Sequence, residues 1–255
     1  MDPTCLSEAA AALAAARQDR KRIDALPDGA RPQTVADAHA IQDAVTALLG
    51  AEVSAYKANA PKPGDPASSG LRGPIYAAET YASPAAFPVA IAPQCGVEGE
   101  IAFRFRQDLP PRDTPYTRDE VAAAVDASVA IEVVSSRFAN PDAAAVLDKL
   151  ADRISNGGFV IGTIVEDWRA LDLAKLKVRL TVNGETVLEQ IGGHPIGDPL
   201  AVAVALVDML RTGVGVKAGQ FVTCGSCTGL RYIKPGDTCS VTFEKLGGAE
   251  LTFTP

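Results

Sequence analysis

The sequence has no long hydrophobic run, few cysteines and only two histidines. Because no apolar run reaches about 18 residues, we expect no helix to span a membrane. The N-terminal segment is rich in alanine but soon becomes charged, and it lacks the basic start, apolar block and cleavage site of a secretory signal. The five cysteines, at positions 5, 95, 224, 227 and 239, do not have the spacing of a disulfide framework. We therefore expect a protein of the reducing cytoplasm.

Positive charge is also scarce, since 24 lysines and arginines stand against 31 aspartates and glutamates. The resulting net charge of −7 argues against a nucleic-acid partner or an anionic membrane surface. Basic residues cluster at 17–22 and 175–179, but both clusters are short. We expect the first cluster to be a solvent-exposed face of a helix.

The rare residue types limit two familiar kinds of active site. With only His39 and His194, and without a G-x-S-x-G motif, a Ser–His hydrolase is disfavoured. Cys224 and Cys227 have C-x-x-C spacing, but they follow a predicted strand instead of opening a helix, where a thiol pKa falls. We expect a turn whose backbone N–H groups face a site, with a redox pair or a zinc site as the less favoured alternatives.

The order of the predicted elements indicates an α+β fold. Residues 7–17 and 34–49 have helix-forming sequence, and the second segment opens with a capping-box pattern at Thr34. Residues 54–76 are rich in proline, glycine and serine, so we predict a loop-bearing connection there. From about residue 95, short segments typical of β-strands dominate. The predicted strands are 99–106, 128–135, 158–165, 176–182, 186–190, 219–224, 238–245 and 249–254, and the helices among them are 117–127, 142–153 and 199–212.

Two local signals support this division of the chain. Asn183-Gly184 lies between alternating segments and predicts a tight hairpin. Asp198 followed by proline predicts a helix start. We predict an N-terminal helical and loop region over residues 1–75 and a β-rich domain over residues 76–255.

Residues 95–105, CGVEGEIAFRF, place two glutamates in a segment that otherwise has the pattern of a buried strand. Glu98 and Glu100 are two residues apart, so their side chains lie on the same face of a strand. Glu132 interrupts the apolar run 128–135, which has the composition of a strand buried on both faces. Burying a polar group without a partner costs roughly 2–7 kcal/mol, and burying a charge costs more.

Three arrangements would offset that cost. Arg104, Arg106 and Arg137 are candidate cationic partners, and a raised pKa is a second solution. The third is a divalent cation between the carboxylates, and an all-oxygen ligand set of this kind suits Mg²⁺ or Mn²⁺. In the simplest alternative, the glutamates of 95–105 lie on a solvated strand face beside Arg104. The isolated Glu132 favours the metal site.

Several segments resemble the 2-keto-4-pentenoate hydratase family, which belongs to the fumarylacetoacetate hydrolase superfamily. They are VEGEIAFRF (97–105), AIEVVSSRF (130–138), ADRISNGGFVIG (151–162), GDPLAVAVALVDML (197–210) and GQFVTCGSCTG (219–229). The similarity covers most of the chain and rests on the order and spacing of these segments. It implies rolled mixed β-sheets with outer helices, and a homodimer or a higher homo-oligomer.

The resemblance also implies an enzyme that uses Mg²⁺ or Mn²⁺ to act on a small 2-oxo acid or dienol. The metal-binding carboxylates of the family fall on Glu98, Glu100 and Glu132. Its lysine and serine fall on Lys57 and Ser155, which are the candidate catalytic residues. We expect burial and the neighbouring cation to lower the pKa of Lys57.

The sequence departs from the family pattern at positions that bear on proton transfer. Ala78 stands where the family often has an aspartate, with Glu79 next to it, and Arg153 replaces an asparagine. His39 replaces a tyrosine. We predict hydration of a 2-hydroxy-2,4-dienoate to a 4-hydroxy-2-oxo acid. Decarboxylation, tautomerisation or C–C hydrolysis of related 2-oxo acids, and a non-catalytic homologue, are the alternatives.

Overall fold

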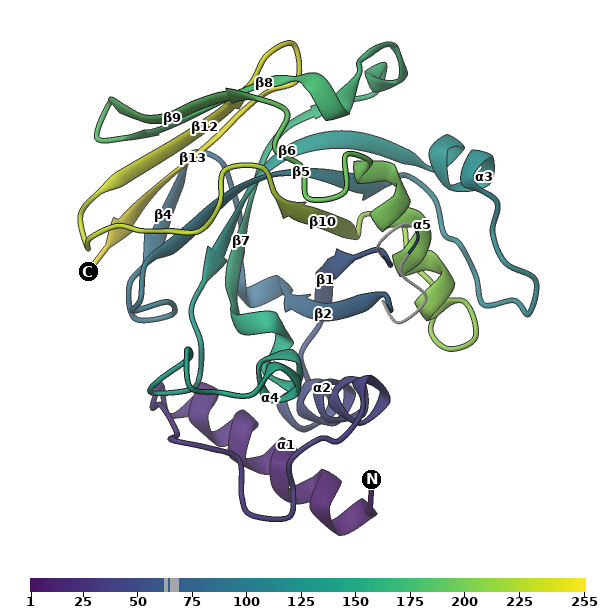
Figure 1. The fold of residues 1–255 in the computed structure, drawn as a ribbon, viewed down its shortest axis with the longest axis vertical. Coiled ribbons are helices and arrows are strands. Elements are labelled where there is room, and N and C mark those ends of the chain that lie inside the picture. Colours follow the sequence, from purple (N-terminus) through teal and green to yellow (C-terminus); the bar gives the residue numbers. More distant parts are fainter. Residues whose placement is uncertain (62–63, 65–68) are drawn as a thin grey trace.

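The computed structural model, described for residues 1–61, 64 and 69–255, contains two β-sheets and a layer of N-terminal helices (Figure 1). This arrangement confirms the predicted α+β class. The helices are α1 (Pro3–Gln18), α2 (Val35–Leu49), α3 (Arg118–Ala123), α4 (Val146–Ala151) and α5 (Pro199–Leu210). The strands are β1 (Val53–Asn59), β2 (Leu71–Tyr76), β3 (Thr80–Ala82), β4 (Ala85–Pro88), β5 (Gly96–Phe105), β6 (Val125–Val134), β7 (Asn156–Val165), β8 (Lys177–Val182), β9 (Glu185–Ile191), β10 (Phe221–Ser226), β11 (Arg231–Tyr232), β12 (Thr238–Phe243) and β13 (Gly247–Thr254). Among the described residues, no helix is long and apolar enough to cross a membrane.

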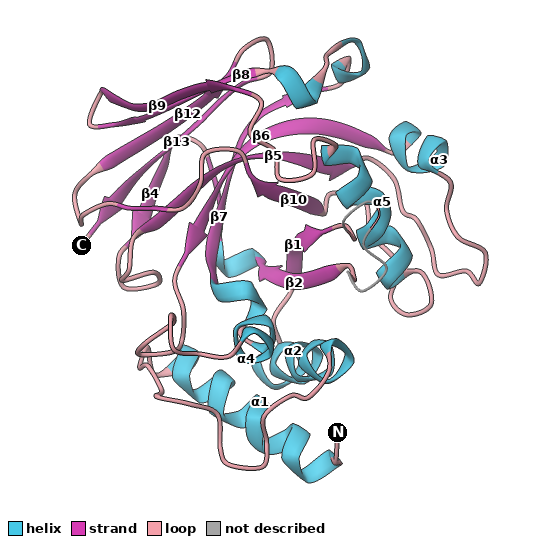
Figure 2. Cartoon of the chain, viewed as in Figure 1, coloured by secondary structure: helices cyan, strands magenta, loops and turns pink. Residues whose placement is uncertain are grey.

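The larger sheet has eight strands in the order β2–β1–β10–β5–β6–β7–β3, with β11 paired to β5. The smaller sheet has the order β4–β13–β12–β8–β9 and packs against the larger one through β13, which contacts β6 and β7. The larger sheet is strongly curved, α5 lies along β10 and β1, and α1, α2 and α4 form a separate helical layer (Figure 2). The central strands β5 and β6 therefore lie between other strands on both sides.

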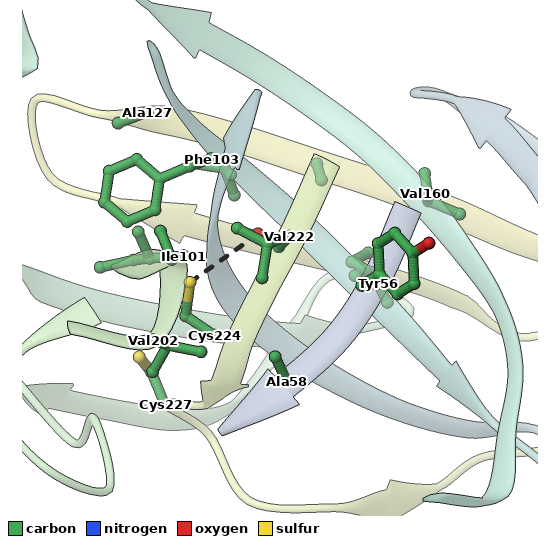
Figure 3. Packing of buried hydrophobic residues seen from close by; sticks show 14 of the residues in the cluster. Tyr56, Ala58, Ile101, Phe103, Ala127, Val160, Val202, Val222, Cys224 and Cys227 are labelled. Atoms are coloured by element: carbon green, nitrogen blue, oxygen red, sulfur yellow. Dashed lines mark hydrogen bonds between the residues drawn. The ribbon is translucent and has the colours of Figure 1, made fainter. Parts of the chain in front are cut away.

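Packing in the hydrophobic core explains why residues 96–105, with their two glutamates, form a strand. On β5, Val97, Ile101 and Phe103 are fully buried on the face opposite the glutamates. All ten residues of β6 are buried, as its apolar run predicted. Figure 3 shows Ile101 and Phe103 in one hydrophobic cluster with Val222 of β10. This cluster fixes the orientation of β5 and hence the face on which its glutamates lie.

Local sequence signals are confirmed at three turns and caps. The side chain of Thr34 accepts a hydrogen bond from the N–H of Asp37, and the carboxylate of Asp37 accepts one from the N–H of Thr34, which completes the capping box of α2. Asn183 and Gly184 have φ values of 51° and 83°, as a tight hairpin between β8 and β9 requires. Asp198 caps α5 by accepting a hydrogen bond from the N–H of Ala201.

Three predicted elements differ from the structure. The loop predicted over 54–76 instead forms β1 and β2, which pair antiparallel, although its residues 62–63 and 65–68 lie outside the described part. Pro74 is compatible with β2 because this strand lies at the sheet edge. The helix predicted over 117–127 ends at Ala123, because Val125 already pairs with β5. The helix predicted over 142–153 covers only α4, and the division at residue 75 stays a prediction.

Candidate metal centre

The strands β5 and β6 bring three glutamates together. Their antiparallel register places Glu98 directly opposite Glu132, and Glu100 lies two residues along the same face of β5. One carboxylate oxygen from each of the three lies within 4.8 Å of the others. Glu100 and Glu132 are fully buried, whereas Glu98 is partly exposed and borders a cavity of about 240 Å³.

Each buried carboxylate uses one oxygen for the protein and keeps the other free. Glu100 Oε2 accepts hydrogen bonds from the Thr223 hydroxyl and, at 2.7 Å, from the Gly225 N–H. Glu132 Oε1 accepts a hydrogen bond of 3.1 Å from Asn156 Nδ2. Within the described residues, Glu100 Oε1 and Glu132 Oε2 have no hydrogen-bond partner. Because buried oxygens are almost always partnered, this pair of free oxygens points to a ligand.

Burial and mutual repulsion raise the pKa of the two buried glutamates. Burial and the neighbouring charges of Glu132 and Glu98 raise the pKa of Glu100 to about 8. Burial also raises the pKa of Glu132. Without a cation, the cluster therefore retains a proton near neutral pH, and a bound divalent cation would replace it.

Among the described residues, Lys57 of β1 is the cation that contacts the cluster. Its Nζ lies 3.0 Å from Glu132 Oε1 and 3.5 Å from Glu98 Oε2. Burial lowers the pKa of Lys57, but the carboxylates of Glu132, Glu98 and Glu100 outweigh burial and hold this pKa above its ordinary value. In the metal-free chain Lys57 is therefore protonated, and its pKa is raised and not lowered. The lowered pKa that we expected stays a prediction for the chain with a cation bound.

The arginines that the sequence offered as partners bind elsewhere. Arg104 and Arg106 contact Asp126 at 2.6 and 3.3 Å. Arg104 stands directly opposite Asp126, four residues along β5 from Glu100, which is roughly 13 Å of strand. Arg137 pairs with Asp152. The predicted cationic partners and the solvated strand face are therefore both wrong.

Ser155 reaches the same cavity through an unusual turn. The three residues of Arg153–Ser155 have φ values of 54°, 56° and 58°, and each left-handed non-glycine residue costs roughly 1–2 kcal/mol. A Cβ on Gly73 of β2 would lie 2.9 Å from the backbone of Arg153, so only glycine permits this close approach. The turn places Ser155 in the lining of the cavity that also contains Lys57.

Glu79 and its neighbours differ from the pattern of a catalytic carboxylate. Ala78 supplies no acid, and Glu79 is bound by Arg153, at 2.9 Å, and by Arg17. The side chains of Arg153 and Arg17 are only 2% and 13% exposed. The expectation that residues 17–22 form a solvated helix face is thus wrong for Arg17, because α1 ends at Gln18 and turns this side chain inward.

Replacing Glu79 by glutamine should lower the free energy of unfolding by about 3–5 kcal/mol, because two buried guanidinium groups lose their shared counter-charge. Chemical denaturation at pH 7 measures this loss. Glu189→Gln removes a carboxylate from a surface ion pair with Lys177 and Arg179, and we expect it to have little effect. An equal effect of the two substitutions would contradict the role assigned to Glu79.

The same pair predicts a pH dependence. Burial alone would raise the pKa of Glu79, but Arg153 and Arg17 outweigh burial and hold it at about 2, below its ordinary value of 4.5. A carboxylate with a depressed pKa stabilises the fold above its ordinary pKa, and this contribution is lost as the pH falls toward 2. Stability between pH 4.5 and 2 should therefore fall more steeply in the wild type than in Glu79→Gln.

Both histidines make hydrogen bonds to the backbone, and the cysteines of the C-x-x-C segment pack in the core. His39 Nε2 accepts a hydrogen bond of 3.2 Å from the Arg72 N–H, and His194 Nε2 lies 2.8 Å from the carbonyl oxygen of Cys224. Cys224 and Cys227 lie inside the hydrophobic cluster (Figure 3). Burial, and then the charge of Glu100, raise the pKa of Cys227 to about 12. A thiol that resists ionisation is unsuited to redox exchange.

Asn156 and Thr223 are candidate site residues that the sequence reasoning missed. Each is a buried polar residue in an otherwise apolar or small-residue strand, β7 or β10. That is the same signal that identified Glu132. Applied to the predicted strand 219–224, it would have found Thr223. Asn156 precedes the predicted strand 158–165, so the signal would have missed it.

The central strands of the curved mixed sheet hold three converging carboxylates beside a lysine. Divalent cations prefer oxygen ligands of this kind. The fold and the site therefore define a class of α+β proteins with a candidate metal site. Residues 55–254 match the fumarylacetoacetate hydrolase C-terminal family. The chain belongs to the fumarylacetoacetate hydrolase superfamily, which confirms the resemblance seen in the sequence.

Three known proteins illustrate the similarity. The chain is 32% identical over 263 residues to a 2-keto-4-pentenoate hydratase of Paraburkholderia xenovorans, covering 99% of this chain and 96% of the relative. The structure of 4-oxalocrotonate decarboxylase from Pseudomonas putida G7, complexed with magnesium and adipate, superposes with a TM-score of 0.84 at 21% identity, over 99% and 98% of the two chains. Fumarylpyruvate hydrolase from Pseudomonas aeruginosa, in complex with Mn²⁺ and pyruvate, has a TM-score of 0.57 at 14% identity, over 78% and 88%. The chain is thus a homologue of 2-keto-4-pentenoate hydratases.

Proposed function

We propose that this protein is a metal-dependent hydro-lyase that converts a 2-hydroxy-2,4-dienoate into a 4-hydroxy-2-oxo acid. The observation that carries the proposal is a pair of oxygens, on Glu100 and Glu132, that no described residue partners and that are buried beside Glu98 and Lys57. The near-complete similarity to a 2-keto-4-pentenoate hydratase supports the choice of reaction.

Glu98, Glu100 and Glu132 would hold Mg²⁺ or Mn²⁺. The residues fit such an ion because the donor set is entirely oxygen and because both buried glutamates keep one oxygen free of protein contacts in the described chain. The solved relatives with magnesium and Mn²⁺ support the same class of ion. When bound, the cation would supply Lewis-acid chemistry that stabilises negative charge on the oxygens of a 2-oxo acid.

The remaining residues would orient the reactants and transfer protons. Lys57 Nζ is a charged donor in the cavity wall, and we assign it the transfer of a proton to the far carbon of the dienol as this ketonises. Ser155 would orient the substrate or the water that then adds to the conjugated double bond. Asn156 and Thr223 hold one oxygen of their glutamates and leave the other directed for binding. The volume of about 240 Å³ suits a short acid.

Decarboxylation of a related 2-oxo diacid is the second candidate reaction. It is favoured by the TM-score of 0.84 with 4-oxalocrotonate decarboxylase, which extends over nearly the whole of both chains. Both reactions would use the same carboxylates and differ in whether a carbon is lost.

Ultraviolet spectroscopy and mass spectrometry test the proposal. Purified protein with Mg²⁺ or Mn²⁺ should remove the absorbance of freshly made 2-hydroxypenta-2,4-dienoate, and the product should carry every substrate carbon plus one water. Release of carbon dioxide from a 2-oxo-3-enedioate without dienol hydration would instead support the decarboxylase. Turnover of neither substrate, nor of acylpyruvates, would support a non-catalytic homologue.

We also propose that the protein acts in the cytoplasm as a homodimer or a higher homo-oligomer. All five cysteines are free, which suits a reducing compartment. Sedimentation velocity of the purified protein measures the assembly, and a monomer at micromolar concentration would contradict it.

A further inference from the structure

A second cavity, of about 360 Å³, lies beside the C-terminal end of α1. Its volume falls within the range of about 300–1,000 Å³ that is typical of small-molecule sites. Its lining contains five cationic side chains and, among the described residues, a single carboxylate, that of Glu79. The cations are Arg17, Arg20, Lys21, Arg22 and Arg137. In a chain of net charge −7, such a concentration of positive charge needs an explanation.

The buried arginines in and behind the wall of this cavity outnumber their counter-charges. Arg17, Arg137 and Arg153 share two carboxylates, Glu79 and Asp152. Burial, together with repulsion from Arg137 and Arg153, lowers the pKa of Arg17 to about 9. The surplus positive charge is therefore unfavourable as it stands, and an anion would relieve it.

Several donors in the cavity are also unused. Arg17 donates through its two Nη atoms to Glu79 and the carbonyl of Asn156, and Arg137 donates through Nε and Nη2. Arg17 Nε and Arg137 Nη1 make no hydrogen bond within the described chain. The side chains of the neighbouring segment 20–22 are exposed and make no ion pair with any described residue. Both the inner wall and the rim thus offer free charged donors.

We propose that this basic cavity, lined by residues 17–22 and Arg137, binds a small dianion through carboxylate or phosphate oxygens. The site is distinct from the cluster of three glutamates, of which Glu98 lines a different cavity. Without a bound cation, that cluster repels anions. Arginine suits such a ligand because its planar donors match both kinds of oxyanion.

The two cavities share a wall, which makes the second site relevant to the first. Ser136 lines both of them. The carbonyl of Asn156 accepts hydrogen bonds from Arg17 and Arg137, while its side chain donates to Glu132. Asn156 thus contacts both the basic cavity and a glutamate of the candidate metal site. The test therefore uses metal-free protein and measures anion binding alone, so that metal binding does not affect the result.

Isothermal titration of the full-length protein, freed of metal on a chelating resin, with inorganic phosphate and separately with succinate tests the proposal. Saturable binding of either anion is expected. The variant Arg20→Asn/Lys21→Gln/Arg22→Gln should bind at least about tenfold more weakly, the equivalent of one lost charge-assisted contact. These exposed side chains make no ion pair with described residues, so the variant should fold.

The matched control removes three positive charges elsewhere, as Lys175→Gln/Lys234→Gln/Lys245→Asn. Arg20 and Lys245 both have a positive φ, of 53° and 66°, which asparagine tolerates. Each variant therefore places one asparagine at a positive-φ position, and the two are matched in this respect. The control should bind like the wild type. Absence of saturable binding of both anions, or equal weakening in the two variants, would overturn the proposal. Glu98→Gln should leave anion binding unchanged, because Glu98 lines the other cavity.

Discussion

Glu98→Gln should abolish the binding of Mg²⁺ and Mn²⁺ and lower kcat on the order of a thousandfold. A bound cation supplies several kcal/mol of charge stabilisation in a transition state, and about 1.4 kcal/mol corresponds to a factor of ten. Glu98 is the most informative of the three glutamates because it is partly exposed. Its substitution also removes repulsion from Glu100 and Glu132, so the metal-free variant should be at least as stable as the wild type.

Titration with Mn²⁺ and the change in melting temperature on adding metal measure this effect apart from activity. Asp142→Asn provides the control, because Asp142 lines the same cavity but does not belong to the glutamate cluster. We expect the control to keep both metal binding and turnover. If Glu98→Gln leaves metal affinity and turnover unchanged, the proposed function is wrong.

Lys57→Met should lower kcat by about 10²–10⁴-fold, the usual contribution of a positioned proton donor. Methionine preserves most of the length and the apolar character of the lysine stem while removing the charged Nζ. Because Lys57 competes with a cation for Glu132 and Glu98, the variant should bind Mn²⁺ as tightly as the wild type or more tightly. Lost turnover with retained metal binding is the signature that separates this residue from the metal ligands.

Lys149→Met is the matched control, since Lys149 also lines this cavity but makes no ion pair with the described glutamates. Steady-state kinetics and Mn²⁺ titration of both variants complete the comparison. A Lys57→Met enzyme with normal kcat, or one that has lost metal binding as well, would contradict the assigned proton transfer.

The sequence predicted the central strands and the glutamate cluster because both depend on local spacing. Residues two apart share a face of a strand, and a lone acid in an apolar run indicates a buried charge. The strands β1 to β4 were missed because their identity depends on partners far along the chain. β1 pairs with β10 across more than 160 residues of sequence, as in Ala55 with Phe221.

The same limitation explains the errors in the site. The pairing of Lys57 with Glu132 crosses two intervening strands of the sheet, so no spacing in the sequence indicates it. Arg104 was a reasonable partner by proximity along β5, but the register placed Asp126 opposite it. Arg17 appeared to belong to a solvated basic cluster because the inward turn of its side chain depends on Glu79, which lies far along the chain.

The opposition of Glu98 and Glu132 across β5 and β6 also limits how the length of this chain can change during evolution. Since side chains alternate between faces, one residue inserted within either strand would carry a glutamate to the far side of the sheet. The connection at 106–124 between these strands can gain or lose residues without moving either glutamate. Natural variants of this chain should therefore differ in length in the connection and keep both strands free of insertions and deletions.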